Sequence, residues 1–572
     1  MAEGCLRDPY NRPVDMPRPL VPASLARGGS AAVVAPHHLA TTAGLGILRA
    51  GGSAVDAAIA TNAVLAVVFG EACGIGGDAF WLIWDEATAV QVALNGSGRA
   101  PASADAAALR AGGLATLPFR GPLTITVPGA VRSWGDAHAR FGRLPWADVL
   151  APAIELAGGG FPADEHFARS VEAAAAVFAR ELGDGARGWA ATYRPLGRAW
   201  QPGERVRLPA LAATLERLAT AGAGDLYDGE LAARQAVGLG AAGSGITAAD
   251  LAAHASTWEA PLSLSYRGAT ATTHPPNSSG LIALEVLNVL RALEPPDRSD
   301  FIPGAGGATA GADLRWAHLG IEATKRALAD RDAHLSDPAF VDVPVARLLD
   351  PAYGDALARA IDPGRASTPL PSRAPRGGGT IWLGVVDPQG NAVSLIESNY
   401  AGFGSGVVDP ATGIAYQNRG SYFSLDPEHP NVLAPGKRTL HTLLPGMLLR
   451  DGRPWVVHGS MGGDAQPAIF AQVVSALVDG GVDVATAVAA PRWSPVPAAH
   501  FAPPDLVQVE PRFRPGLLDG LAAMGHRLDI RAPFDGALGH AHAIELVAGG
   551  PATGGTVAAA TDPRSPGLAA AW

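Results

Sequence analysis

The sequence predicts an α+β fold built in layers, and three patterns support this prediction. The first half of the 572-residue chain is dominated by alanine-rich segments with helical periodicity. From about residue 380 onward, apolar strands alternate with helices, beginning with a hairpin pattern. Hydrophobic residues make up 48% of the chain, which is enough for a large core, and the length alone would allow several domains. Helices followed by strands with interleaved helices are typical of sheets covered by helices.

The helices of the first half are marked by apolar residues at helical spacing and by start signals. A helix is expected after the Gly-Gly-Ser break at residues 51–53, with Asp56 early in it. Other helices are expected at residues 130–142, 147–157, 211–222, 280–294 and 314–335. Residues 351–379 are rich in proline, arginine and glycine without periodicity, so we expect an exposed, flexible loop there.

The second half begins with a β-hairpin pattern. The strands "TIWLGVVD" (380–387) and "AVSLIES" (392–398) flank a "DPQGN" turn. Further strands are expected at residues 413–418, 446–460 and 527–534, and a helix is expected near 465–481. Asp464 is the expected N-cap of that helix and Pro467 lies in its first turn.

Composition excludes several classes of function. The net charge is -10 and no basic block occurs, which argues against nucleic-acid binding and favours a small-molecule partner. No apolar run is long enough for a membrane span, and the first twenty residues do not resemble a secretory signal, so a cytoplasmic protein is expected. Cys73 is interpreted as a buried, inert thiol. His540 and His542 lack further ligands at metal spacing, so we expect neither a metal nor another cofactor.

The stretch "RGGGTIWLGVV" places three glycines directly before Thr380. A threonine hydroxyl becomes a competent nucleophile when its own terminal amine acts as the base, which requires cleavage of the Gly379–Thr380 bond. Glycine would let the hydroxyl approach the preceding carbonyl for an N-to-O acyl shift. A flexible linker before an ordinary strand is the alternative, and this stretch alone does not decide between them.

A second glycine-rich motif, "HGSMGGDAQPAIF", lies at an expected strand-to-helix junction. Backbone N–H groups at Gly462 and Gly463 could stabilise an oxyanion there, because the first N–H groups of a helix are unpaired. A phosphate cradle or a simple tight turn explains the same pattern.

Taken together, the motifs resemble the γ-glutamyltransferase (γ-glutamyltranspeptidase) family of N-terminal-nucleophile hydrolases. The similarity runs nearly end to end and includes "GGSAVDAAIATNAVLAVV", "CGIGGDAF", "SGRAP", "VPGAV", "GGGT", "FGSG", "APGKR" and "GSMGGD". The resemblance implies a four-layer αββα sandwich that is formed jointly by residues 1–379 and 380–572 after self-cleavage between Gly379 and Thr380. The two subunits would come from one precursor and stay packed together, and a higher homo-oligomer stays an open alternative.

The resemblance also implies roles for individual residues. Thr380 would be nucleophile and base, Gly462 and Gly463 the oxyanion hole, and Ser398 a second hydroxyl bonded to the nucleophile. The substrate-binding positions differ from those of the glutamyl-specific members. Arg99 lies two residues after the position where an arginine is expected, and Tyr400 stands where an asparagine is expected, with Asn399 next to it. Arg419 replaces a glutamine, and Tyr422 replaces an aspartate that would bind an ammonium group. His441 and Thr442 replace a pair of serines.

These differences suggest a change in the acyl group. Without a carboxylate at Tyr422, a buried substrate ammonium would lose its partner, whereas Arg99 and Arg419 still offer donors to a carboxylate. We therefore hypothesise an acyl group that carries an anion without needing an α-amine, as in glutaryl, oxamate-type or acylated β-lactam substrates. Ordinary γ-glutamyl binding restored by neighbouring residues is the alternative.

Two other functions would place different demands on the sequence. A serine hydrolase would need a G-x-S-x-G elbow, which "HGSMGG" does not supply. A non-catalytic binding protein on the same scaffold, with a vestigial threonine, would remain a single uncleaved chain. The sequence leaves open whether water or an amine accepts the acyl group.

Overall fold

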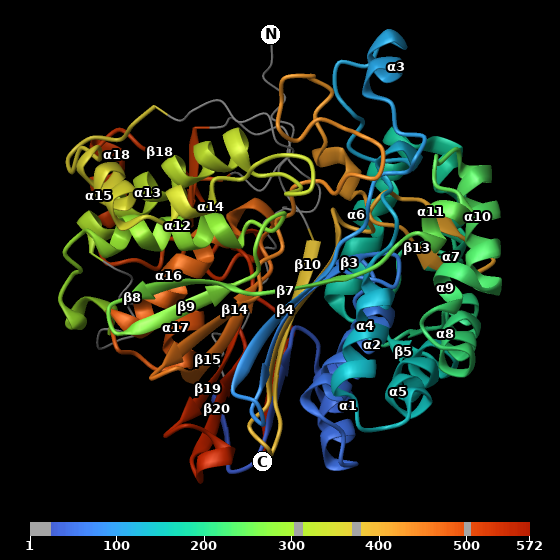
Figure 1. Cartoon of the computed structure of the whole chain (residues 1–572), viewed down its shortest axis with the longest axis horizontal. Helices are drawn as coiled ribbons and strands as arrows, with labels where there is room; N and C mark the ends of the chain where they lie inside the picture. Colours follow the sequence, from blue (N-terminus) through green and yellow to red (C-terminus); the bar gives the residue numbers. More distant parts are fainter. Residues whose placement is uncertain (1–24, 303–312, 369–378, 497–504) are drawn as a thin grey trace.

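The computed structural model describes residues 25–302, 313–368, 379–496 and 505–572. Two seven-stranded sheets lie face to face, and helices cover the outer face of each (Figure 1). The predicted four-layer αββα sandwich is thereby confirmed.

The first sheet is built from strands that lie on both sides of residue 380. Its order is β1 (Leu25–Gly28), β20 (Thr556–Ala560), β19 (Ala541–Val547), β15 (Arg453–Ser460), β14 (Gly446–Arg450), β9 (Ala269–Thr273) and β8 (Leu262–Tyr266). All of its neighbouring strands pair antiparallel.

The second sheet mixes early and late strands in the same way. Its order is β21 (Leu568–Ala571), β2 (Ala32–Ala35), β10 (Gly379–Val386), β11 (Ala392–Tyr400), β3 (Asp78–Asp85), β4 (Val90–Gly96) and β7 (Thr257–Glu259). β10 and β11 form the predicted hairpin, and Asp387 accepts backbone N–H bonds within its turn. Because both sheets combine strands from before and after residue 380, neither part of the chain would bury its sheet faces alone.

The outer helical layers differ in size. The second sheet is covered mainly by α1 (His38–Arg49), α2 (Ala54–Val68), α4 (Ala130–Phe141), α5 (Trp146–Gly159), α6 (Glu165–Glu181), α7 (Arg187–Tyr193), α8 (Pro209–Ala221), α9 (Asp225–Asp228), α10 (Glu230–Ala242) and α11 (Ala248–Ala252). The first sheet is covered by α12 (Gly280–Arg291), α13 (Leu314–His334), α14 (Val345–Leu348), α15 (Pro351–Arg359), α16 (Gln466–Val478), α17 (Val484–Ala489) and α18 (Leu517–Ala523). The helices expected from the sequence are all present, with small shifts at their ends.

Shorter elements decorate the rim of this sandwich. These are the helix α3 (Ala106–Ala111), the strand pairs β5 (Phe161–Pro162) with β6 (Arg205–Val206) and β12 (Val408–Asp409) with β13 (Ile414–Ala415), and the small sheet of β16 (Trp493–Ser494), β17 (Leu506–Val509) and β18 (Arg527–Ile530). The strand expected at 413–418 is therefore reduced to the two residues of β13.

Three apolar clusters hold the layers together. One lies between the two sheets and includes Phe80, Trp382, Ile396 and Ile544. The other two lie between each sheet and its helices. Asp56 lies early in α2, as predicted, and it forms a capping box there with Ser53. Cys73 is fully buried in the cluster next to α2, as predicted, and burial raises the pKa of its thiol.

Two local predictions are wrong. The expected loop at 351–379 begins with a helix instead, α15, because Asp350 caps it and Pro351 takes its first position. Residues 369–378 of that segment lie outside the described residues. Asp464 does not cap α16, since it lies in a short 3₁₀ helix (Gly463–Ala465) before it, whereas Pro467 occupies the first turn as expected.

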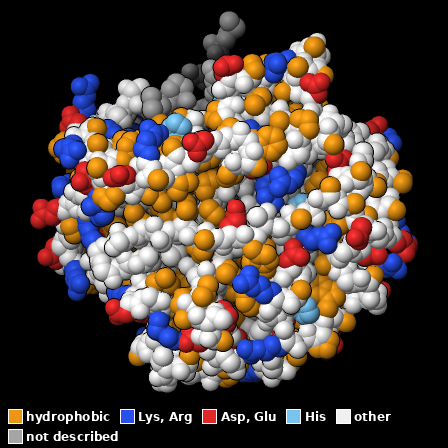
Figure 2. Space-filling view, in the orientation of Figure 1, with side chains coloured by type: hydrophobic (Ala, Val, Ile, Leu, Met, Phe, Trp, Pro, Cys, Tyr) orange, Lys and Arg blue, Asp and Glu red, His pale blue; other side chains and the backbone are white. Residues whose placement is uncertain are grey.

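The face of the molecule shown in Figure 2 mixes charged and apolar side chains. Lys and Arg are interspersed with Asp and Glu and with hydrophobic side chains over the face shown in Figure 2. None of the helices in the described ranges combines the length and apolar character needed to cross a lipid bilayer.

Candidate active site

Thr380 lies at the start of β10, where the register with β11 is irregular. Gly379 pairs with Tyr400 and Ile381 with Glu397, so Ser398 and Asn399 form a bulge on β11 opposite Thr380. The Thr380 side chain is buried, and its hydroxyl lies 2.8 Å from the carbonyl oxygen of Gly379. The predicted nucleophile is thus held against the bond whose cleavage would free its amine.

Ser398 on β11 completes a small hydroxyl network around this bond. Its Oγ donates to the Gly379 carbonyl oxygen at 2.6 Å and lies 3.1 Å from the Thr380 Oγ. The backbone N–H of Tyr400 donates to the same Oγ at 2.7 Å. This arrangement orients the Ser398 proton toward the Gly379 carbonyl and polarises that carbonyl toward attack.

Arg419 is the cation nearest to this network. It lies in a 3₁₀ helix, Arg419–Tyr422, and is almost fully buried. Its guanidinium donates to Ser398 Oγ at 3.3 Å and to Thr442 Oγ1 at 3.0 Å, and it lies over the ring of Tyr400 at 4.5 Å. Within the described chain its Nε has no hydrogen-bond partner and the guanidinium forms no ion pair. A buried guanidinium without a carboxylate partner is a strong attractor for an anion.

Tyr422 takes part in a different contact from the one its position suggested. Its hydroxyl donates to Asp464 at 2.8 Å, and the other oxygen of Asp464 pairs with Arg331 at 2.5 Å. The Tyr422 ring also contacts that of Tyr400. Asp464 is therefore occupied by a buried ion pair with α13 and a tyrosine, which explains why it does not cap α16.

Gly462 and Gly463 lie between β15 and α16, as expected, with φ values of 151° and 54° that favour glycine. Asp464, which follows them, joins this turn to Tyr422 and so to the wall of the site. The role of the two glycines as oxyanion donors stays a prediction.

Two predicted substrate-binding residues lie apart from the hydroxyl network. Arg99 is one-third exposed and bonds the carbonyl of Gly436 at 3.1 Å, with Asp337 at 3.5 Å. Asn399 is buried on the face of β11 opposite to Ser398, where its side chain lies beside Gly74. Ser398 contacts Thr380 directly, and Tyr400 and Arg419 both bond to Ser398. Thr442 bonds to Arg419, and the Tyr422 ring contacts that of Tyr400.

Asp78 has no role predicted from the sequence. This residue is buried and lies directly opposite Ser398 in the register between β3 and β11. The Nε2 of His441 lies 3.3 Å from the Asp78 carboxylate, within hydrogen-bond distance. The neighbouring Thr442 instead accepts a hydrogen bond from Arg419. Burial raises the pKa of Asp78 to about 7, although the nearby Arg419 acts in the opposite direction. Its place in the motif "CGIGGDAF" is the sequence signal from which a role for Asp78 could have been predicted.

A second buried carboxyl, Glu397, lies on β11, on the face opposite to Ser398. Glu397 accepts bonds from Asn62 at 3.1 Å and from the Gly74 N–H at 3.0 Å. Burial raises the pKa of Glu397 to about 8, so it carries a proton at neutral pH. It faces α2 and not the gap between the sheets.

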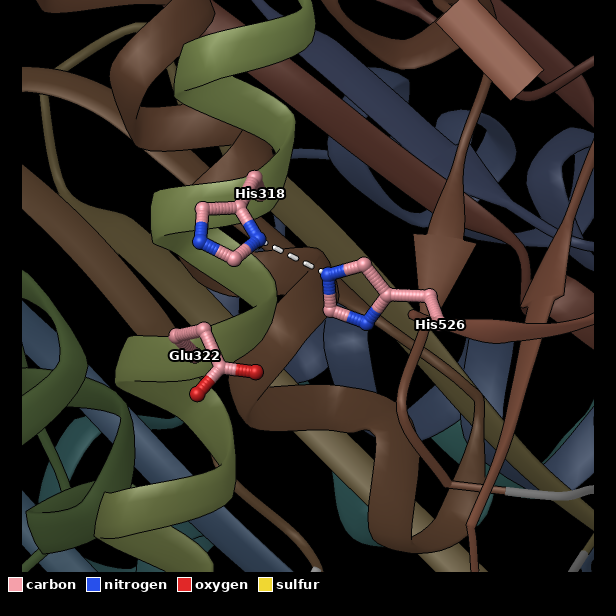
Figure 3. Close-up of side chains that lie close together, drawn as sticks. All are labelled: His318, Glu322 and His526. Atoms are coloured by element: carbon pink, nitrogen blue, oxygen red, sulfur yellow. Dashed lines mark hydrogen bonds between the residues drawn. The ribbon is translucent and has the colours of Figure 1, made fainter. Parts of the chain in front are cut away.

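Among the residues that the structure describes, one grouping has the composition of a metal site: His318, Glu322 and His526 (Figure 3). Its ligand atoms are already engaged. The two imidazoles bond each other at 2.8 Å, His318 also bonds the Asp362 carbonyl at 2.8 Å, and Glu322 pairs with Lys325 at 2.8 Å. The cluster is well explained as a link between α13 and its neighbours.

Both histidines of the "HAH" motif are buried. His542 is buried on β19, and its Nδ1 lies 2.9 Å from the hydroxyl of Thr561 and accepts the N–H of Asp562 at 3.2 Å. His540 is buried just before that strand.

Comparison with known proteins gives consistent results. The sequence model of the family described as gamma-glutamyltranspeptidase matches residues 40–572. The chain is 40% identical over 548 residues to the oxamate amidohydrolase proenzyme of Klebsiella pneumoniae, covering 94% of this chain and 98% of that protein. It is 38% identical over 544 residues to the glutathione hydrolase-like YwrD proenzyme of Bacillus subtilis, covering 94% and 97%. The crystal structure of cephalosporin acylase from Bacillus halodurans superposes with a TM-score of 0.88 at 37% identity, covering 98% and 99%.

Proposed function

This chain belongs to the gamma-glutamyltranspeptidase family, and we propose that it is a self-cleaving amide hydrolase whose acyl substrates carry a carboxylate next to the amide. The hydroxyl network around the Gly379–Thr380 bond supports the first part of this proposal, and the buried guanidinium of Arg419 supports the second.

Self-cleavage begins with attack of the Thr380 Oγ on the carbonyl carbon of Gly379. The Ser398 hydroxyl, which donates to the Gly379 carbonyl oxygen at 2.6 Å, stabilises the negative charge that develops there, and the Arg419 guanidinium supports Ser398. The C–N bond then breaks and its nitrogen takes up the proton that the Thr380 hydroxyl has lost, leaving Gly379 as an ester on the Thr380 oxygen. Water hydrolyses this ester and frees the Thr380 amine together with a Gly379 carboxylate.

The mature site repeats this chemistry on a substrate. The Thr380 amine accepts the proton of its own hydroxyl, because an N-terminal amine has an ordinary pKa near 8 and is partly neutral at pH 7. The hydroxyl attacks the substrate amide, ammonia or an amine leaves with that proton, and water releases the acyl group from the ester. The N–H groups of Gly462 and Gly463 are the proposed donors to the oxyanion.

The position of Arg419 favours short anionic acyl groups. Its Nη2 lies 3.3 Å from the Ser398 Oγ, which in turn lies 3.1 Å from the Thr380 Oγ, so the guanidinium is within two hydrogen-bond lengths of the nucleophile. An oxamate carboxylate is bonded directly to the amide carbon, so it can bind Arg419 while the amide carbonyl lies beside the Thr380 hydroxyl. In γ-glutamyl and glutaryl groups, three carbons separate the carboxylate from the amide and must fold into the same space.

The surroundings of Tyr422 also favour an acyl group without an ammonium. Its hydroxyl is already bonded to Asp464, and the charge of Asp464 is balanced by Arg331. An ammonium placed there would meet no free carboxylate from this pair. The similarity to a protein named oxamate amidohydrolase agrees with this choice of substrate.

Ammonia release from four small amides tests the proposal. Oxamate, glutaramate, L-glutamine and the neutral glycolamide all share the same leaving group, so differences in kcat/KM report on the acyl group. We expect oxamate to be the best substrate and glycolamide to be poor, with a Thr380→Ala variant inactive on all four. Faster turnover of L-glutamine than of oxamate and glutaramate would refute the anionic, amine-free acyl group and restore γ-glutamyl specificity.

A further inference from the structure

Asp78 lies at the same end of the sheet as Thr380 and Ser398, on the third of three neighbouring strands. β10, β11 and β3 are adjacent, and Ser398 and Asp78 are directly opposed across β11 and β3. Residues two positions along from this pair, Ile396 and Phe80, both belong to the apolar cluster between the sheets. Because side chains two apart on a strand share a face, Ser398 and Asp78 face the same gap, and their Cβ atoms are neighbours.

The Asp78 carboxyl is held rigidly in this position. One oxygen accepts the N–H of Gly98 at 2.9 Å, and the other lies 3.3 Å from the Nε2 of His441. The Nδ1 of His441 accepts the N–H of Leu443 at 3.3 Å, so its ring proton is on Nε2 and points at Asp78. Asp78 is 1% exposed and therefore has little water to screen its charge.

The charged and titratable groups around Asp78 come from several elements. They are Arg419, Arg438, His441, His274, Glu397 and Tyr227. The two guanidiniums attract its negative charge, while burial keeps the pKa values of His441 and His274 low, so both imidazoles are neutral near pH 7. Burial is the largest effect on Asp78 itself and raises its pKa to about 7.

A bound acyl carboxylate would change this balance. In the empty site, an ionised Asp78 partly compensates the unpaired charge of Arg419. Once a substrate carboxylate binds that guanidinium, two negative groups share it in a water-poor gap, and like charges at short range disfavour ionisation of one of them. Protonation of Asp78 removes this repulsion, and the protonated carboxyl can keep its hydrogen bonds to Gly98 and His441.

We propose that Asp78 is a specificity-determining residue that takes up one proton from solvent when an anionic acyl group binds to Arg419. The inference rests on the proposed function, since it requires an acyl group with a carboxylate. It predicts that the enzyme selects anionic over neutral acyl groups more strongly at low pH than at high pH.

The test compares KM for oxamate and for neutral glycolamide between pH 6 and 9 in the wild type and in Asp78→Asn. In the wild type, KM for oxamate should rise above pH 7 and approach a tenfold increase per pH unit, while KM for glycolamide should lack this rise. In Asp78→Asn the oxamate KM should lose this pH dependence and lie below that of the wild type at pH 9. Titration of the Thr380 amine appears with both substrates and both enzymes, so it cancels in the comparison.

Glu397→Gln is the matched control, because it removes another buried carboxyl of raised pKa, one residue from Ser398 but on the other face of β11. This variant should keep the wild-type dependence of oxamate KM on pH. A pH dependence that survives in Asp78→Asn, or is lost in Glu397→Gln, overturns the proposal.

A measurement on the wild type alone guards against an Asp78→Asn variant that fails to fold. Calorimetric binding of oxalate at pH 8 in two buffers of different ionisation enthalpy counts the protons taken up. We expect close to one proton per oxalate, and none would overturn the role of Asp78. A wild-type enzyme that hydrolyses no anionic amide refutes the proposed function, and this inference with it, whereas turnover without proton uptake refutes Asp78 alone.

Discussion

Replacing Ser398 with alanine removes the hydroxyl that donates to the Gly379 carbonyl oxygen at 2.6 Å. That bond is one donor to an oxyanion formed in a buried site, and loss of one such donor costs about 2.7–4 kcal/mol of transition-state stabilisation. Self-cleavage of Ser398→Ala should therefore be about 10²–10³-fold slower than that of the wild type. Ser398→Thr is the matched control, since it retains the hydroxyl and should cleave within a few-fold of the wild type.

The rate is best followed from the moment of synthesis. Pulse-labelled cell-free translation of the full chain, followed by denaturing gels over time, shows the precursor converting into fragments 1–379 and 380–572. A Ser398→Ala precursor that matures as fast as the wild type would refute the assignment of this hydroxyl to the oxyanion. If both Ser398→Ala and Ser398→Thr were slow to the same degree, the effect would come from packing and not from the hydroxyl.

Two further predictions concern charge. Arg419→Met should lower kcat/KM for oxamate relative to glycolamide by about 10–150-fold, because a hydrogen bond to a charged group contributes about 1.5–3 kcal/mol. An unchanged ratio in the cleaved enzyme would show that Arg419 does not recognise the acyl group. The pKa of Glu397 is raised by burial from an unfolded value near 4.5 to about 8, so this group's contribution to the free energy of unfolding is greatest below pH 4.5 and falls as pH rises toward 8. Denaturant unfolding in an uncleavable Thr380→Ala background should show this fall in the free energy of unfolding, of about 3–5 kcal/mol. Adding Glu397→Gln should flatten the pH dependence. An equal pH dependence with and without Glu397→Gln would contradict a buried, protonated carboxyl.

The layered fold and the catalytic hydroxyls could be predicted because their signals are local. The hairpin around Asp387 follows from strand and turn patterns, and the glycines before Thr380 and the motif around Ser398 follow from short motifs and the family resemblance. In the structure Thr380 and Ser398 lie 3.1 Å apart.

The remaining features depend on contacts between distant parts of the chain. Asp78 acquires its place from strand register with Ser398, and no local pattern encodes that register. Asp464 had the sequence of an N-cap, but Arg331, 133 residues earlier, and Tyr422 bind its carboxylate instead. The start of helix α15 has a sequence signal, an aspartate at 350 followed by a proline. The proline- and glycine-rich composition of the whole segment obscured this signal.

Intact-mass analysis of the purified protein tests the central claim most directly. The wild type should consist of two polypeptides, one ending at Gly379 and the other beginning at Thr380, and it should hydrolyse oxamate. Thr380→Ala should remain a single full-length chain without activity. A wild-type chain that is unbroken and still hydrolyses amides would show that no terminal amine is needed, and would contradict the account.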